Sequence, residues 1–294
     1  MSDRPAIFDS GGATPRPARH SGFSLRGRIG LALILAWAVL ALLAPWISPY
    51  DPDQSDLAAF MAAPSLAGGH LLGTDDLGRD ILSRIFHGAR PVLVVAGLAT
   101  LMSVAIGAAL GIVAGYGGRL VDQVIARIAE IQLTIPGLVL ALLALALFGS
   151  RLENLIIILA LESWPLHFRV ARSYTLNARS QGYMEAAWLA GVPHWRSVLR
   201  HVVPGLLPLL VATSTISAAF IVMTEAGLSF IGLGIQPPKA DWGLMIAQGK
   251  AQLGAAWWLS IMPALALLSL LFGVQLLGDA VSSRLSSLEG GGEA

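Results

Sequence analysis

Long apolar runs alternate with polar segments along most of the chain. The runs cover residues 29–48, 91–115, 122–148, 154–173, 203–224 and 257–281. Each run comes close to the roughly 20 apolar residues that an α-helix needs to cross a bilayer. The pattern therefore predicts an all-α membrane protein with six transmembrane helices.

The distribution of arginine and lysine predicts the orientation of these helices. Positive residues gather in the segments that share a side with the N-terminus, as they do on the cytoplasmic side of membranes. Both termini are therefore expected to be cytoplasmic. The predicted parts are a disordered tail 1–28, a first helix 29–48, an outer loop 49–90, a core domain 91–284 with a cytoplasmic loop 174–202 and an outer loop 225–256, and a cytoplasmic tail 285–294.

Composition supports a lipid environment and excludes several kinds of site. The chain is 55% hydrophobic and 13% charged, whereas about 25% of residues are charged in a typical soluble domain. It contains no cysteine, which rules out disulfides and thiolate metal sites. The net charge of +1 gives no indication of a nucleic-acid partner, and no metal site is predicted. Four tryptophans near the outer boundaries are expected to form an aromatic belt: Trp46, Trp242, Trp257 and Trp258.

Small residues and prolines mark the predicted helices. Gly107, Gly111 and Gly115 recur every four residues, so they share one helix face that another backbone can approach closely. Helix packing within the chain is favoured over a subunit interface. Prolines are predicted to interrupt the third, fourth and sixth helices: Pro136, Pro165 and Pro263. Such breaks survive in lipid only where neighbours or water satisfy the freed carbonyls.

The polar stretch GYMEAAWLAGVPHWRSVLRHVVPG, residues 182–205, lies between two apolar runs. It predicts two short helices, with Gly191 as a left-handed C-cap and Pro193 at the first position of the second helix. The second helix is expected to end before Pro204. One apolar stripe is predicted on it: Trp195, Val198, Leu199 and Val202. Spacing alone leaves open an amphipathic helix on the membrane surface or an element that docks into a partner.

The motifs along the chain resemble one family. EAAWLAG followed by HVVP is similar to the EAA loop of ABC-importer permeases, although His201 and Val203 depart from its general pattern. Further motifs match the dipeptide/oligopeptide/nickel group in the right order: HLLGTDDLGRDILSRIFHGAR (70–90), WPLHFRVAR (164–172), LSFIGLGIQPPKADWG (228–243) and the Gly-Asp at 278–279. Glu130, where the group more often has Asp, and the C-terminal ending depart from it. The chain is therefore identified as resembling a C-type subunit of that group.

The resemblance implies a type I ABC-importer permease in a bacterial inner membrane, crossing it several times. It implies a B-type permease as heterodimer partner, two ABC ATPase subunits that bind ATP and magnesium, and an extracytoplasmic solute-binding protein. This chain would bind membrane lipid but no cofactor, and it would be a transport subunit and not an enzyme. Peptide is the expected solute, with nickel or another small solute as the alternative. The residues implied to couple the chain to the ATPases are Glu185, Ala186, Ala187, Gly191 and Pro204.

Two other classes of protein fit the sequence less well. The chain holds no Walker A motif, so ATP-driven transport requires an ATPase on another chain. A membrane-embedded enzyme is disfavoured because neither G-x-S-x-G nor H-E-x-x-H is present. A self-contained secondary transporter would often show inverted repeats, and none is found.

Ionisable residues at membrane depth are candidates for a transport pathway or gate. They are Glu162, His167 and Glu225. Near a helix end, such a side chain can instead reach interfacial water.

Two outer segments have competing interpretations. In residues 70–90, Thr74 is expected to cap an interfacial helix with Asp75 and Asp76 in its first turn, and this is favoured over a substrate site. Residues 227–243 form either a re-entrant or gating element or a plain outer loop.

Overall fold

A computed structural model describes residues 24–66 and 69–289, and the regular elements in these ranges are all helical. The long helices are α1 (Leu25–Ile47), α2 (Ile81–Tyr116), α5 (Leu152–Arg179), α8 (Val203–Phe230) and α10 (Trp258–Glu289). The shorter helices are α3 (Gly118–Thr134), α4 (Gly137–Phe148), α6 (Gly182–Leu189), α7 (His194–Ser197) and α9 (Trp242–Gly249). Single turns are η1 (Leu57–Ala59), η3 (Lys250–Gln252) and the π-helical η2 (Val198–Val202). The predicted all-α class is confirmed.

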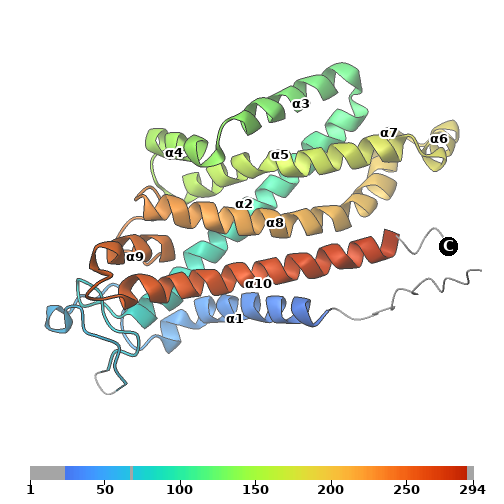
Figure 1. The fold of residues 1–294 in the computed structure, drawn as a ribbon. Helices are drawn as coiled ribbons and strands as arrows, with labels where there is room; N and C mark the ends of the chain where they lie inside the picture. Colours follow the sequence, from blue (N-terminus) through green and yellow to red (C-terminus); the bar gives the residue numbers. More distant parts are fainter. Residues whose placement is uncertain (1–23, 67–68, 290–294) are drawn as a thin grey trace, which may run out of the picture.

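The long helices lie side by side as a bundle (Figure 1). α1 packs along α10, where Gly30 faces the backbone of Gly273, and α2 crosses the bundle to pack against α5. α6 and α7 lie where α1 begins and α10 ends, at the right of Figure 1. α9 and the loop segments 48–66 and 69–80 lie at the opposite end. We call the end with α6 the inner end and the end with α9 the outer end.

The structure supports fewer membrane spans than the sequence predicted. Four helical stretches are long and apolar enough to cross a bilayer: Leu25–Ile47, Ile81–Tyr116, His194–Phe230 and Trp258–Leu285. A fifth is obtained when α3 and α4 are counted as one span bent by 91°. α5 has the length of a span, but it carries acidic and basic side chains along its whole course. The count of six stays a prediction.

The prolines behave differently from one another. Pro136 separates α3 from α4, as predicted. The prediction was wrong for Pro165 and Pro263, because each lies inside a continuous helix. Proline removes one N–H and crowds the carbonyl four residues earlier, but tertiary contacts can compensate for both effects.

Several predicted boundaries are also wrong. α1 already begins at Leu25, inside the predicted tail 1–28, and α10 continues to Glu289, inside the predicted tail 285–294. The remaining tail residues lie outside the described chain. No helix begins after Thr74: α2 begins at Ile81, and Asp80 caps it by accepting from Ser83 N at 2.8 Å.

The three predicted packing glycines lie where α2 meets α5. A Cβ on Gly107 would come within 2.6 Å of His167 Cβ, and one on Gly111 within 2.5 Å of Ala171 Cβ. A Cβ on Gly115 would meet Thr175 Cγ2 at 2.5 Å. Because even a methyl group would clash at each position, these glycines allow the close approach of the two helices.

Candidate functional site

The acidic helix of the EAA-like segment is α6, at the inner end of the bundle. Met184 is its anchor: the side chain is fully buried with Ala178 of α5 and Val202 of η2. Glu185 and Ala186 are exposed, and Ala187 is half-buried. α6 is therefore held through one buried side chain while its acidic and small residues face outward.

A glycine turn links α6 to the next helix. Gly191 has φ +78°, the left-handed conformation predicted for it. The N–H of Val192 donates to Ala187 O at 3.0 Å, which is the closing bond of a Schellman C-cap. Pro193 is the residue before α7 and not its first residue, so this detail of the prediction was one position off.

The prediction that the second helix ends before Pro204 was wrong. Helical structure is continuous from His194 to Phe230, through α7, η2 and α8. The N–H of Val203 donates to Val198 O, five residues back, so the chain makes a wider π turn before the proline. Figure 1 shows the helix curving there, as is common at π turns and prolines.

The predicted apolar stripe on this helix is divided between two environments. Val202 is buried and Val198 is partly buried, both against α6. Trp195 and Leu199 are each 60% exposed, and Leu189 of α6 is 89% exposed. The inner end therefore exposes three large apolar side chains as well as Glu185.

Polar side chains lie between α5 and α8 inside the bundle. His167 is fully buried, and its Nδ1 lies 3.1 Å from the hydroxyl oxygen of Thr213. Ser163 and Ser217 are also buried, four residues away on the same two helices. Within the described ranges, His167 Nε2 and both serine hydroxyls have no hydrogen-bond partner. We call these four residues the polar stripe.

Glu162 lies beside the polar stripe, at a groove of about 390 Å³ next to the bend between α3 and α4. A Cβ on Gly137 would be 1.9 Å from Glu162 Oε1, so the carboxylate would have to move if residue 137 were not glycine. Both carboxylate oxygens are shielded from solvent, and neither has a hydrogen-bond partner in the part of the chain that the structure describes. An acidic group at membrane depth costs roughly 3 kcal/mol when it faces lipid.

Gln132 connects α3 to α5 at the same place, and no sequence motif pointed to it. Its Nε2 donates to Leu161 O at 2.6 Å and to Glu162 O at 3.2 Å. Its Oε1 accepts from Trp164 Nε1 at 2.8 Å. Leu161 O is the carbonyl that loses its helical donor because Pro165 has no N–H. The amide of Gln132 thus satisfies the group that the proline leaves free.

Glu225 lies far from Glu162, near the outer end of α8. It is fully buried, and its Oε1 accepts from the Ser229 hydroxyl at 3.1 Å. Its carboxyl group lies close to that of Asp241, the buried N-cap of α9. Burial raises the pKa of the Asp241 carboxyl above its ordinary value. The two groups join α9 to α8, and Asp241 was not among the residues predicted to have a role.

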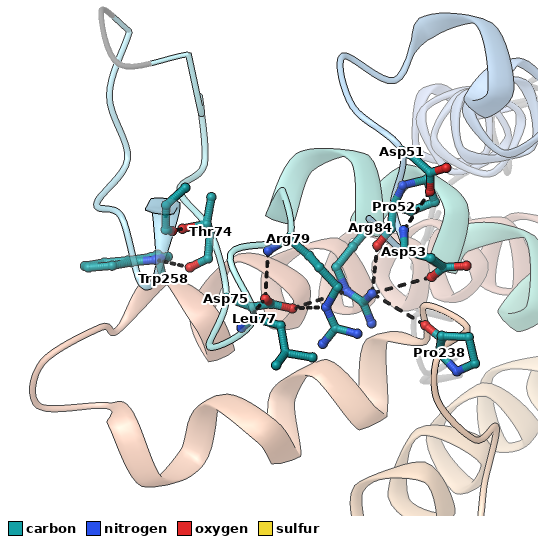
Figure 2. A network of polar contacts seen from close by, with 11 residues as sticks. Asp51, Pro52, Asp53, Thr74, Asp75, Leu77, Arg79, Arg84, Pro238 and Trp258 are labelled. Atoms are coloured by element: carbon teal, nitrogen blue, oxygen red, sulfur yellow. Dashed lines mark hydrogen bonds and ion pairs between the residues drawn. The ribbon is translucent and has the colours of Figure 1, made fainter. Parts of the chain in front are cut away.

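The outer motif GTDDLGRD forms a rigid ionic cap (Figure 2). Asp75 Oδ2 accepts from Arg79 Nε at 2.7 Å and lies 3.7 Å from Arg84 Nε. Arg84 is buried and its Nη1 donates to Pro52 O at 2.8 Å and to Pro238 O at 3.5 Å. Arg84 of α2, paired with Asp75 of the motif, thus bonds to both outer loops, and among the described residues no interfacial helix follows Thr74 directly.

The aromatic-belt prediction was wrong for two of the four tryptophans. Trp242 and Trp258 are buried, and their indole N–H groups donate to Ile85 O and Thr74 O at 3.0 and 3.2 Å. Amphipathic indoles pair their N–H with a carbonyl when buried, so the same residue type suits both environments.

The structure groups the predicted residues into separate regions. Glu185, Ala186, Ala187, Gly191 and Pro204 all belong to the inner end. Glu162 and His167 lie midway along α5, whereas Glu225 contacts the outer loop. Within residues 24–66 and 69–289, no group of three or more metal-ligating side chains is found.

Two family models match this chain. Residues 107–287 match the family model described as binding-protein-dependent transport system inner membrane component. Residues 27–64 match the N-terminal TM domain of oligopeptide transport permease C.

Similar proteins are found among bacterial permeases. The di/tripeptide transport system permease protein DppC of Pseudomonas aeruginosa is 35% identical over 87% of this chain and 86% of its own length. The dipeptide permease protein DppC of Haemophilus influenzae is 33% identical, over 97% and 98%. A chain of the MetNI methionine ABC transporter, solved in inward-facing conformations, has the same fold with a TM-score of 0.54. That chain is 20% identical, and the match covers 69% of this chain and 97% of that one.

Proposed function

Because the chain belongs to the family of binding-protein-dependent transport system inner membrane components, we propose that it is the C-type permease subunit of an ABC importer for di- and oligopeptides. Membership of this family makes it a multi-pass inner membrane transport subunit and not an enzyme. The peptide substrate is carried over from the names of relatives that match most of this chain.

The proposed assembly contains four kinds of partner. A B-type permease forms the heterodimer, two ABC ATPases bind ATP with magnesium, a solute-binding protein delivers the peptide from outside, and lipid surrounds the bundle. α5 is the sixth span, with its charged groups facing other protein. Both termini and α6 are cytoplasmic, which is supported by the positive residues of the inner segments.

The single observation that carries the proposal is the construction of the inner end. α6 presents Glu185 and Leu189 outward while Met184 fixes it to the bundle, and Trp195 and Leu199 lie exposed on the following helix. That helix continues without a break to Phe230. A partner that binds α6 and shifts it therefore also moves α8. The outer end of α8 in turn contacts α9.

Reversing the charge of Glu185 tests this docking role. Glu185→Lys should lower uptake of dipeptides at least tenfold, and mild-detergent purification should recover less of the ATPase, because buried interface charges are sensitive to truncation or reversal. The amount of chain in the membrane should not change, since Glu185 is exposed.

Glu153→Lys is the matched control. Glu153 is an exposed glutamate at the other end of α5, where its side chain is 69% accessible. It should leave both ATPase recovery and uptake near wild type. Normal ATPase recovery with Glu185→Lys would contradict docking at α6. Failure of the wild-type chain to bring down any ATPase would contradict the importer itself.

A further inference from the structure

We infer that the groove at the bend between α3 and α4 binds a cationic amino group of the transported solute, with the Glu162 carboxylate as counter-ion. This rests on the proposed function, because it takes the chain to line a transport path. The ligand class is a primary ammonium, such as the amino terminus of a short peptide.

The depth of Glu162 is the first reason. It is ten residues beyond the start of α5 at Leu152, a rise of about 15 Å along the helix. The hydrocarbon core is about 30 Å thick, so this carboxylate lies near its middle if α5 crosses the membrane upright. An acidic group there must face protein or a water-filled path, and not lipid.

The charge of the groove is the second reason. Among the described residues that line it, Glu162 is the one charged side chain, and none is basic. No ion pair involves Glu162 within the described ranges. Glu162 is therefore a buried acidic group without a counter-ion, and a bound cation would stabilise its charged form.

The neighbouring groups suit an ammonium better than a metal ion. Ser163 and Ser217 line the same groove, and their buried hydroxyls are unpartnered among the described residues. One carboxylate and two hydroxyls can accept the three N–H donors of a primary ammonium. A divalent ion wants more oxygen ligands than these, and no second acidic side chain from the described part of the chain lines the groove.

The volume and the apolar lining of the groove suit the part of a small solute that lies beyond its ammonium group. Its volume of about 390 Å³ falls in the range of roughly 300–1,000 Å³ that is usual for small-molecule sites. Leu140, Ile216 and Phe220 supply apolar surface around the polar centre. An apolar wall with a few convergent polar groups is the common form of a ligand pocket.

The test uses the whole complex purified with its partners and reconstituted into liposomes. The probe is an equimolar mixture of dipeptides with free and with N-acetylated amino termini, and uptake is measured by mass spectrometry. Glu162→Gln, which keeps the shape beside Gly137, should lower uptake of the free-amino dipeptides about tenfold at subsaturating concentration. Glu162→Asp should restore part of that uptake, and Glu153→Gln should behave as wild type.

For each variant, two control measurements show whether the complex is intact. They are recovery of the second permease and the ATPase, and ATP hydrolysis stimulated by the binding protein. If these are normal and only uptake of the free-amino peptides falls, the subsite is supported. Unchanged uptake with Glu162→Gln would overturn it. Loss of the second permease from the Glu162→Gln complex would also overturn it, since Glu162 would then pair with a neighbouring chain. If the wild-type complex imports none of the dipeptides, the peptide function itself fails and the proposed ligand fails with it.

Discussion

At the scale of single residues, Gln132 shows how the chain tolerates a proline inside a buried helix. Pro165 takes the donor away from Leu161 O, and the Gln132 amide of another helix replaces it. The same amide accepts from Trp164. α3 and α5 are therefore connected through one side chain.

Replacing Gln132 tests whether its amide and Pro165 affect stability together. Gln132→Leu should destabilise the protein by about 1 kcal/mol, since Leu161 O and Trp164 Nε1 lose their partner. The loss of stability caused by Gln132→Leu should be smaller in a Pro165→Ala background, because alanine returns a backbone N–H to Leu161 O. Thermal unfolding of the two single variants and the double variant in detergent measures this. Strictly additive losses would show that the proline and the amide are independent.

Residue-level predictions succeeded where local backbone chemistry decides the outcome. Gly191 takes the left-handed conformation because glycine has no Cβ to oppose it. Thr74 failed as a helix cap because Asp80, six residues later, caps α2, while the Thr74 hydroxyl accepts from Ala62 N. Two capping residues in one segment cannot be ranked without their tertiary contacts.

At the scale of elements, α9 is held to α8 by two buried carboxyl groups. Asp241 caps α9 by accepting from Leu244 N at 2.9 Å, and it faces Glu225 of α8. Two adjacent carboxyl groups in a buried site cannot both be ionised without a large cost. The contact therefore holds a proton.

The pH dependence of stability tests this contact. The pKa of Asp241 is raised in the folded state, so folded protein binds more protons than unfolded protein, and stability falls as pH rises above the ordinary value of 3.8. Asp241→Asn keeps the cap and donates an amide N–H to Glu225. It should raise the unfolding midpoint at pH 8 by about 2–4 °C, or roughly 1 kcal/mol, and flatten its decline with rising pH.

Asp56→Asn provides the control, because Asp56 is an exposed cap of η1. It should leave the slope of the midpoint against pH as in the wild type. An unaltered slope with Asp241→Asn would mean that the α8–α9 contact does not titrate in this range.

Element predictions failed mainly where a polar group is satisfied from far along the chain. The helix through Pro204 continues because a π turn accommodates the proline, and no periodicity signals such a turn. Trp242 and Trp258 find their carbonyl acceptors 157 and 184 residues away. The apolar runs themselves were predictable, since lipid requires long apolar helices whatever their neighbours.

At the scale of the whole molecule, the two ends of the bundle differ in construction. The outer end is closed by a network around Arg84, which fixes loops from distant parts of the sequence. The inner end exposes large apolar side chains on α6 and α7. The outer end is thus held together by side-chain contacts between loops, whereas the exposed residues of α6 and α7 belong to the surface that we propose for docking.

Cysteine labelling can check the proposed topology, because the chain has no cysteine of its own. Leu189→Cys should react with a membrane-impermeant maleimide only in inverted vesicles, and Leu57→Cys only in intact spheroplasts. Both leucines are largely exposed in this chain, and it is expressed without the ATPases, which would cover Leu189. Labelling of both positions from one side would contradict the proposed orientation, in which the α6 end is cytoplasmic and the α9 end faces outward.

The unbroken course of α8 has a mechanical consequence. Its 28 residues make a rod about 42 Å long. If the inner end is the pivot, tilting such a rod by about 5° displaces its far tip by roughly 4 Å, given the same rise per residue. That tip carries Glu225 and the contact with α9. In that case, a small tilt of α8 at η2 would move its contact with α9 by roughly the size of a water molecule.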